Sequence, residues 1–550
     1  MDRIKRIIRD NGGLFVALAV AAALKAALLA MNVVPFNADE AVVALMARHI
    51  LQGERPVFFY GQAYLGSLDA WLIAGAFALF GPSVAAARVV QSLLYLGTIA
   101  TTYALGLKIF ADRWAATAAA LLLAIPTVLV TLYTTATLGG YGETLLIGNG
   151  LLLWAVRLRG SAGATPGVRS TVEWLLFGAL AGFGFWGFGL LGVYLLPIAV
   201  ALIAPNSYRE DTKGAKFLLV FLRVLRAFAV KHLSAIIGFA LGSAPWWWAA
   251  ASGGAAALSE LGGSAIAGAS AHGPLGNIAL HLFSLVVLGL PVIAGLRPPW
   301  GVTWLALPLW PLALPLFFGA AGWAARVARR DWKKAMLFGV GLTALGAFVL
   351  TPFGADPSGR YFLPLAAPLA LFTGDLLRRV RSERPRWAIA LLAGLIVFNL
   401  WGNLQSARAF PPGLTTQFDA VAQVDQRDLP AVIDFLRTHG ETRGYTNYWV
   451  EFPMAFLSNE QLLYSAALPY HPNFSYTRRD DRYPPYAAAV AASSRAAYVT
   501  TRHPALDDRL RAQFTALGVT FSETTLGDFH IFYGLSRKVT PAELDLSPQP

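Results

Sequence analysis

Two adjacent acids, Asp39 and Glu40, directly follow the first long apolar run of the chain, residues 13–31. An acidic pair at the outer mouth of a transmembrane helix can serve as a general base or a metal ligand for a molecule that arrives through the lipid. Helix capping explains the same residues without chemistry. In that interpretation Asn37 is the N-cap, and both acids lie in the first helical turn, where they compensate the helix dipole.

Two further charged side chains are predicted at the outer ends of membrane helices. Glu143 ends a Gly-rich stretch at such an end, where an unpaired carboxylate is costly, and its structural alternative is pairing with an arginine. Arg360 begins a late apolar helix, where a guanidinium can bind two phosphate oxygens. The alternative for Arg360 is an interfacial arginine whose stem crosses apolar surface, with Tyr361 as an aromatic neighbour.

Three more side chains complete the set of candidates. Arg88 lies near the outer end of the second long apolar run and is a second candidate for phosphate binding. Gln62 and Tyr64 precede a short apolar helix, and their side chains suit the hydroxyl groups and ring faces of a sugar. For Tyr64 the alternative is anchoring at the membrane interface.

The composition is that of a polytopic membrane protein. The 550 residues are 56% hydrophobic and only 14% charged, and the chain contains several apolar runs long enough to cross a bilayer. No cleavable signal is evident, so the first helix is expected to stay as an anchor. Zero cysteines exclude disulfides, thiolate catalysis and cysteine metal sites.

The net charge of +13 is unevenly divided, with +15 in residues 1–402 and −2 in residues 403–550. Basic clusters lie at helix ends, as the positive-inside rule requires of cytoplasmic loops, so nucleic-acid binding is not implied. With those clusters inside, about eleven crossings are predicted, with a cytoplasmic N-terminus and an outer C-terminus. The predicted crossings are 13–32, 84–110, 113–133, 139–156, 172–188, 190–204, 232–250, 303–325, 335–352, 360–377 and 387–404.

Three apolar segments are not counted as crossings. Residues 277–296 are interpreted as re-entrant or interfacial, because counting them would place the cluster from Arg326 to Lys334 outside. Residues 38–52 and 66–80 are predicted to be helices that lie along the outer surface of the bilayer. A Gly/Ala/Ser stretch from Ala249 to Gly276 is predicted to be a mobile outer loop that closes over a substrate.

The last quarter of the chain holds about half of its acids and no long apolar run, which indicates a separate water-exposed domain at residues 403–550. An amphipathic helix is predicted over residues 428–438, and strands over 443–449, 497–501 and 529–533. The fold class expected is therefore an all-α polytopic membrane protein, residues 1–402, with a small α/β extracytoplasmic domain.

Four segments resemble one family. They are DEAVVALMARHILQG (39–53), FYGQAYLGSLDAWLIAGAFALFG (59–81), VAAARVVQSLLYLGTIATTYALGLKIF (84–110) and GRYFLPLAAPLAL (359–371). Together they resemble the polyprenyl-phosphate-sugar-dependent glycosyltransferases of the GT-C superfamily. The similar branch contains protein O-mannosyltransferases and bacterial aminoarabinose transferases. A fainter likeness covers YTNYWVEFPMAF (445–456), for which strand packing is the simpler interpretation.

The resemblance implies a cavity between the first outer loop and the outer helix ends. A lipid-linked donor enters that cavity from the membrane, and an acceptor enters from the water. It also implies that Asp39 deprotonates the acceptor hydroxyl while Glu40 orients it or assists. The phosphate-binding group would be Arg360, Tyr361 and Arg88, and the substrate-binding group would be Glu143, Gln62 and Tyr64. No cofactor is required by these residues, and a divalent cation is possible.

The function expected is an inverting hexosyl- or pentosyltransferase in a bacterial plasma membrane. It would move a sugar from polyprenyl phosphate to an extracytoplasmic glycan, lipid or protein. A transporter or flippase of lipid-linked glycans is the alternative, because many spans and basic outer residues also suit a phosphate-bearing lipid. A third possibility is a non-catalytic scaffold of an envelope assembly. Only the enzyme predicts that Asp39→Ala abolishes transfer while folding and lipid binding persist.

Overall fold

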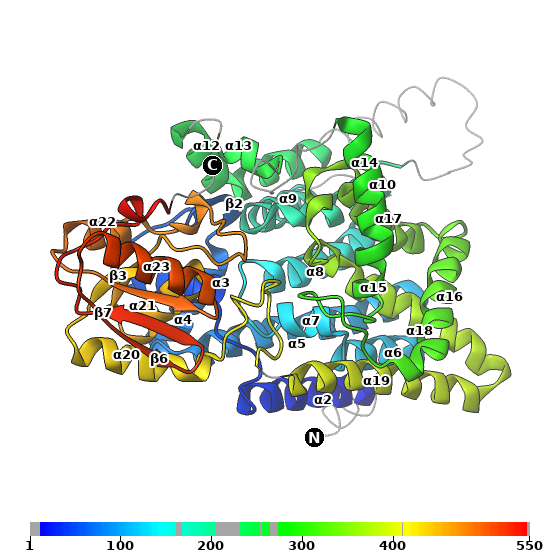
Figure 1. Ribbon diagram of the computed structural model, residues 1–550. Helices are drawn as coiled ribbons and strands as arrows, with labels where there is room; N and C mark the ends of the chain where they lie inside the picture. The colour runs from blue at the N-terminus through cyan, green and yellow to red at the C-terminus, as the bar shows by residue number, and fades with distance from the viewer. Residues whose placement is uncertain are drawn as a thin grey trace, which may run out of the picture.

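The computed structural model describes residues 11–160, 168–204, 231–253, 256–263, 273–409 and 411–546 (Figure 1). A mass of long helices forms one side of the molecule, and a smaller sheet with flanking helices forms the other. The two parts meet along α3 (Ala38–Leu51), α4 (Leu68–Phe80) and α21 (Tyr448–Leu457). This is the predicted fold class, a mostly helical membrane protein with a small C-terminal sheet region.

The membrane part is built from helices of very different lengths. Its α-helices are α2 (Gly12–Ala30), α5 (Val84–Phe110), α6 (Arg113–Ala124), α7 (Val128–Tyr133), α8 (Tyr141–Gly160), α9 (Val168–Gly187), α10 (Gly192–Ile203), α12 (Ala244–Gly253), α13 (Ala256–Leu261), α14 (Pro274–Ser284), α15 (Leu290–Ile293), α16 (Trp310–Ala328), α17 (Trp332–Leu350), α18 (Ala366–Glu383) and α19 (Pro385–Arg408). Single-turn segments are η1 (Gly189–Leu191), η2 (Leu285–Gly289), η3 (Leu307–Leu309), η4 (Pro352–Ala355) and η5 (Arg360–Leu365).

Within the described residues, six helices are long and apolar enough to cross a membrane. A seventh is added if Lys231–Gly242 and Ala244–Ser252, which meet at 58°, form one broken span. The count of eleven crossings therefore stays a prediction. One of the six is the continuous run Pro274–Ile293, which was expected to be re-entrant or interfacial. Its length and hydropathy suit a membrane span. The prediction against a span depended only on the position of the basic cluster from Arg326 to Lys334.

The predicted span 113–133 is broken in two. Pro126 lies between α6 and α7, and a proline that lacks an N–H group ends the regular helix. The side chains of Asn399 and Asn403 on α19 donate to the free carbonyls of Ile125 and Pro126, at 2.8 Å each. Side chains of α19 thus hold the break between α6 and α7.

The first outer loop contains a hairpin that the sequence did not predict. Strands β1 (Phe58–Phe59) and β2 (Gln62–Gly66) pair antiparallel and lead into α4. Gly66 must be glycine, because a Cβ there would lie 2.3 Å from the carbonyl oxygen of Trp186. The hairpin therefore packs directly on the end of α9, and an isolated bridge joins Leu65 to Phe188.

The helix α3 is buried, contrary to the prediction that it lies on the outer surface of the bilayer. Its apolar residues from Ala38 to Ala47 are almost wholly buried between α4 and α21. The predicted surface position followed from an amphipathic pattern and a short length. The helix α21 of the C-terminal domain covers the face of α3 that was predicted to be exposed to water.

The C-terminal domain has a five-stranded mixed sheet in the order β4-β3-β5-β7-β6. Its strands are β3 (Arg443–Thr446), β4 (Leu463–Ala466), β5 (Ala497–Thr501), β6 (Ser522–Leu526) and β7 (Phe529–Tyr533), and its other helices are α20 (Leu429–Thr438), α22 (Pro484–Ala492) and α23 (Pro504–Ala516). The predicted helix and the last two predicted strands are present. The first predicted strand ends at Thr446, and the aromatic segment after it is the helix α21.

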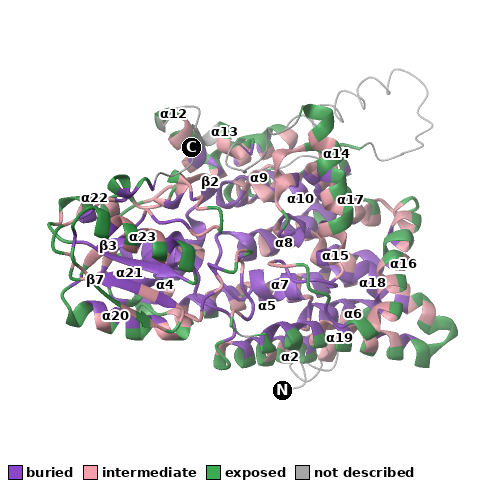
Figure 2. Ribbon diagram, viewed as in Figure 1, coloured by how far each residue is buried: buried purple, intermediate pink, exposed green. Residues whose placement is uncertain are grey.

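Burial distinguishes the two parts (Figure 2). Most of the sheet of the C-terminal domain is buried, and β6 is its exposed edge strand, whereas α2, α16 and α19 have an exposed outer face. Large apolar side chains such as Trp387 and Ile389 lie on those exposed faces, as expected for helices that contact lipid. The predicted mobile loop at residues 249–276 contains the helices α12 and α13, and residues 254–255 and 264–272 lie outside the described part.

Candidate functional site

The N-terminus of α3 positions the two acids of the pair. Asn37 caps the helix, and its side-chain oxygen accepts a hydrogen bond from the backbone N–H of Glu40 at 3.0 Å. Asn37 also donates to the hydroxyl of Thr416 in the C-terminal domain at 3.2 Å. The cap fixes the first turn of α3, from which Asp39 and Glu40 point in different directions.

Glu40 is fully buried and forms a two-pronged ion pair with Arg88. Its carboxylate oxygens lie 2.9 Å and 2.7 Å from Nε and Nη2 of Arg88. The backbone N–H of Thr137 donates to the same carboxylate at 3.3 Å, and Arg88 also donates to the carbonyl of Pro35 at 3.2 Å. Because Arg88 is 3% exposed and already paired, the structure argues against the phosphate-binding role predicted for it.

Asp39 faces a polar cavity of about 280 Å³ between the two parts of the molecule. Its Oδ1 accepts a hydrogen bond from the hydroxyl of Tyr448 at 2.5 Å, and in the described part of the chain its Oδ2 accepts none. The cavity brings together residues from α3, the outer helix ends and the C-terminal domain. They are Asp39, Tyr133, Leu138, Tyr141, Asp356, Pro357, Ser358, Arg360, Thr416, Phe418 and Trp449.

Arg360 lines the same cavity, as the predicted role requires. The preceding Gly359 has φ +77°, a left-handed conformation that favours glycine, and it turns the chain into η5. Nη2 of Arg360 lies 2.6 Å from Oδ2 of Asp356, while Nε of Arg360 has no hydrogen-bond partner among the described residues. The unpartnered Nε is itself buried, but the Arg360 side chain as a whole is 30% exposed, and its guanidinium can donate a further hydrogen bond to an anionic oxygen in the cavity.

Tyr361 does not line the cavity, and its ring centroid lies 5.2 Å from the guanidinium of Arg360. It is 8% exposed, its ring packs edge-on against Phe353, and its hydroxyl has no hydrogen-bond partner in the described chain. The structure thus assigns Tyr361 to the packing beneath Arg360, not to contact with a phosphate in this cavity.

Gln62 and Tyr64 lie on β2 and do not line the cavity. With its amide oriented by its neighbours, the Gln62 oxygen accepts from both terminal nitrogens of Arg482, at 2.9 Å each. Tyr64 packs against Phe188 with the ring centroids 6.4 Å apart. The hairpin therefore connects the membrane part to the C-terminal domain, which differs from the sugar-binding role predicted for these two side chains.

Glu143 is buried at the start of α8, beside Asp69 of α4. Asp69 accepts hydrogen bonds from the side chains of Gln91 and Thr137 at 2.8 Å and 2.6 Å. Neither oxygen of Glu143 has a hydrogen-bond partner among the described residues, so the alternative of an arginine partner is not observed there. Glu143 does not line the cavity, and its neighbour Asp69 accepts a hydrogen bond at 3.2 Å from the backbone N–H of Gly139, in the loop that carries Leu138.

Some cavity residues were missed by the sequence reasoning. Asp356 lies four residues before Arg360, in a segment that was read only for its arginine. Trp449, which lines the cavity, and Tyr448, which bonds to Asp39 beside it, belong to the aromatic segment that was interpreted as a packed strand. The signal available for them was Asn447, a good N-cap, which starts the helix α21 by accepting from the backbone N–H of Trp449 at 3.0 Å.

The geometry can be compared with known proteins. Residues 67–235 match the sequence model of the family described as dolichyl-phosphate-mannose-protein mannosyltransferase. No curated protein matches the chain. Among solved structures, ArnT from Cupriavidus metallidurans bound to undecaprenyl phosphate superposes with a TM-score of 0.56 at 13% identity, covering 95% of this chain and 98% of that one.

Two further structures are similar. The apo state of the same ArnT gives a TM-score of 0.57 at 13% identity, over 95% of this chain and 97% of that one. The oligosaccharyltransferase of Archaeoglobus fulgidus, in complex with Zn and sulfate, gives 0.52 at 14% identity, over 94% of this chain and 72% of that one. The chain therefore has the GT-C fold, and the resemblance to the GT-C superfamily of polyprenyl-phosphate-dependent glycosyltransferases is confirmed.

Proposed function

We propose that this protein is an inverting glycosyltransferase that moves one sugar from a polyprenyl-phosphate donor to an acceptor on the outer side of the membrane. One observation carries the proposal: a carboxylate with a free oxygen, Asp39, and a partly exposed guanidinium, Arg360, line the same cavity. Displacement at an anomeric carbon requires a base for the incoming hydroxyl and a cation for the leaving phosphate.

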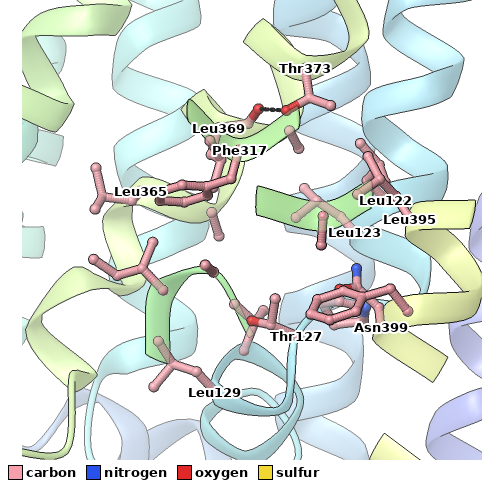
Figure 3. A pocket seen from close by; sticks show the side chains of 18 of the residues that line it. Leu122, Leu123, Thr127, Leu129, Phe317, Leu365, Leu369, Thr373, Leu395 and Asn399 are labelled. Atoms are coloured by element: carbon pink, nitrogen blue, oxygen red, sulfur yellow. Dashed lines mark hydrogen bonds between the residues drawn. The ribbon is translucent and has the colours of Figure 1, made fainter. Parts of the chain in front are cut away.

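A second, apolar pocket supports a lipid donor (Figure 3). It has a volume of about 110 Å³ and lies among α6, α7, α16, α18 and α19, with lining residues such as Leu123, Phe317 and Leu369. The segments α7 and η5 contribute to both cavities: Val130 and Leu365 line the apolar pocket, while Tyr133 and Arg360 line the polar one. A phosphate at Arg360 would thus have apolar side chains close by for its prenyl chain.

The reaction follows from this arrangement. Oδ2 of Asp39 takes the proton of the acceptor hydroxyl as the acceptor oxygen bonds to the anomeric carbon. The bond between that carbon and the phosphate oxygen breaks, and the electron pair leaves with polyprenyl phosphate, whose charge Arg360 stabilises. A single displacement inverts the anomeric configuration. The acceptor enters from the side lined by Thr416, Phe418 and Trp449, where the cavity is formed by the C-terminal domain.

The donor atoms in the cavity are not a ready-made cation site. Asp356 already pairs with Arg360, and one oxygen of Asp39 is occupied by Tyr448. Among the described residues, no group of three or more His, Cys, Asp or Glu side chains converges on one point. Asp39 and Arg360 therefore act in these steps without a cation, and transfer measured with and without EDTA tests whether a divalent cation contributes.

The enzyme and the transporter predict different products. Purified protein in lipid vesicles would be supplied with a panel of labelled polyprenyl-phosphate sugars, with and without EDTA. We expect labelled product from one donor, or slow release of free sugar when no acceptor is present, with an inverted anomeric configuration by NMR. Movement of intact labelled lipid across the bilayer without any product would contradict the proposal and favour the transporter.

A further inference from the structure

The C-terminal domain reaches into the cavity at the start of α21. Asn447 caps this helix and also donates to the hydroxyl of Thr501 on β5 at 2.8 Å. The first helical residue, Tyr448, is therefore placed by the sheet of the domain. Its hydroxyl donates to Oδ1 of Asp39 at 2.5 Å, across more than 400 residues of sequence.

Tyr448 is held firmly in this position. It is 2% exposed, and its ring lies edge-on to Trp449 and Phe452. The guanidinium of Arg482 lies 5.4 Å from the ring centroid, within the range of a cation–π contact. Burial and then the nearby Asp39 carboxylate raise the pKa of Tyr448 well above its ordinary value, so the hydroxyl keeps its proton and acts as a donor.

Arg482 connects Tyr448 to the membrane part. It donates to the carbonyl of Gly61 at 3.3 Å and to the side chain of Gln62, both in the hairpin of the first outer loop. In the described chain, Arg482 forms no ion pair with a carboxylate. The Arg482 guanidinium thus contacts both the hairpin and the ring of Tyr448. Tyr448 is therefore held between the hairpin and the sheet of the C-terminal domain.

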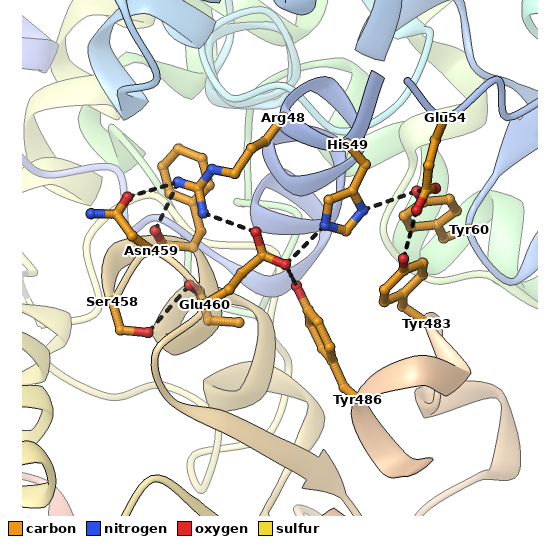
Figure 4. A network of polar contacts seen from close by, with 11 residues as sticks. Arg48, His49, Glu54, Tyr60, Ser458, Asn459, Glu460, Tyr483 and Tyr486 are labelled. Carbon is orange, nitrogen blue, oxygen red and sulfur yellow. Dashed lines mark hydrogen bonds and ion pairs between the residues drawn. The ribbon is translucent and has the colours of Figure 1, made fainter. Parts of the chain in front are cut away.

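A second contact holds the other end of α3 to the same domain (Figure 4). Glu460, just after α21, accepts from Nε2 of His49 at 2.9 Å and pairs with Arg48 at 3.4 Å. Nη2 of Arg48 also donates to the carbonyl of Phe456 at 3.1 Å. The helix α3 is therefore attached to the C-terminal domain near both of its ends, and Asp39 lies at one of them.

We propose that Tyr448 is a positioning residue for Asp39, and that the C-terminal domain completes the active site by placing this hydroxyl. The proposal rests on the function proposed above. The hydrogen bond fixes the plane of the carboxylate and occupies Oδ1, so that Oδ2 is directed to the acceptor hydroxyl. The domain that follows the membrane part is thus required for the chemical step as well as for binding an acceptor.

The test is Tyr448→Phe, which removes one oxygen and keeps the ring. A hydrogen bond to a charged group is lost, so we expect kcat to fall about 10- to 100-fold while KM for the donor changes by less than about twofold. A carboxylate that loses a donor is protonated more easily. The acid limb of the plot of kcat against pH therefore moves to higher pH, which a merely structural residue would not cause.

The matched control is Tyr498→Phe, because the Tyr498 hydroxyl donates to the carbonyl of Val539 at 2.7 Å in the interior of the same domain. We expect no change in its pH profile. Arg482→Lys, which keeps the charge but loses the two-pronged contact with Gln62, should shift the profile in the same direction by less. If Tyr448→Phe folds poorly, the pH profile of Arg482→Lys still tests the positioning role.

Two results would overturn the inference, and they are distinguishable. If the wild type and Tyr448→Phe show the same kcat and the same pH profile, while Asp39→Asn is inactive, the positioning role is wrong and the proposed function stands. If the wild type transfers no sugar from any donor, the proposed function fails, and the role of Tyr448 fails with it.

Discussion

Asp39 and Glu40 are neighbours in sequence with entirely different surroundings. Successive residues of a helix point about 100° apart, so one acid faces the polar cavity and the other faces the interior. Glu40 with Arg88 joins α3 to α5, and its contact with Thr137 also fixes the loop that carries Leu138. The sequence could predict that the pair matters, but not which acid is free, because that depends on an arginine 48 residues away.

Removing one partner of the buried pair should destabilise the protein. Glu40→Gln leaves Arg88 buried without a countercharge, so we expect the free energy of unfolding to fall by about 3–5 kcal/mol. Thermal unfolding in detergent measures the change. Glu383→Gln is the control, because Glu383 forms an exposed ion pair with Arg379 that should contribute almost nothing. Full stability with no transfer in Glu40→Gln would instead place Glu40 in the chemistry.

Local turns and packing also decide which of the other candidate residues reach the cavity. Arg360 reached the cavity because a left-handed glycine turns the chain just before it, a signal that the quoted motif contains. Tyr361, the next residue, is buried, and Gln62 contacts Arg482. Asp39 and Arg360 line the cavity, and the direction of each of the other candidate side chains depends on contacts that are distant in sequence.

At the level of elements, the helix α21 shows where local pattern fails. The segment from Tyr445 to Phe456 is rich in aromatic residues, which favour strands, and it was predicted to be one. The strand β3 ends at Thr446, and packing on α3 makes the rest helical. An N-cap at Asn447 was the one local signal for the helix. Tertiary contacts decided between two local preferences.

Glycine spacing in two membrane helices predicts that they pack closely. The segment Gly178 to Gly182 of α9 has the G-x-x-x-G spacing, as does Gly238 to Gly242 at the end of the helix Lys231–Gly242. A Cβ at Gly182 would lie 2.0 Å from the carbonyl oxygen of Phe239, so the two helices touch along their backbones. The close pairing of these helices could therefore have been predicted from sequence.

The contact between α3 and the turn after α21 should depend on pH. Although burial opposes it, hydrogen bonds from His49 and Tyr486 lower the pKa of Glu460 to about 2. Glu460 has φ +61°, a left-handed conformation that is unfavourable for a residue other than glycine. The contacts of its side chain with His49 and Arg48 offset this cost. The stability that Glu460 contributes is complete above its ordinary pKa of about 4.3 and is lost as pH falls from there toward 2.

Glu460→Gln tests this dependence. We expect the free energy of unfolding to fall by about 1–3 kcal/mol at pH 7, because Arg48 and His49 lose a charged acceptor. The difference from wild type should stay constant down to about pH 5 and then shrink. Asp434→Asn, in an exposed pair with Arg437, should show no such difference. A difference that grows below pH 5 would contradict the account.

At the scale of the whole molecule, composition predicted the division into a membrane part and an outer domain, with the break in charge near residue 403. The crossings were harder to predict, because the helices around the cavity are short, broken or bent. Hydropathy reports length and apolar content, whereas Pro126 and the 58° bend after Gly242 redirect the chain inside apolar sequence. We infer that the basic helix ends face the cytoplasm and the C-terminal domain faces outward.

Single cysteines test that orientation, because the chain has none of its own. Ser494→Cys lies on an exposed loop of the C-terminal domain, and Ser382→Cys lies at the exposed end of α18 within a basic cluster. In intact spheroplasts, a membrane-impermeant maleimide should label the first and spare the second. Both should react after permeabilisation. Labelling of Ser382→Cys alone in intact cells would reverse the orientation.

We propose that Asp39 is the base in a sugar transfer from a lipid phosphate. The most direct measurement is single-turnover transfer by purified Asp39→Asn beside wild type, with binding of polyprenyl phosphate measured on the same samples. Our account predicts a loss of at least about 100-fold in transfer, since a general base contributes roughly 10²–10⁴, with unchanged lipid binding. Transfer within a fewfold of wild type, with the protein folded and lipid bound, would contradict it.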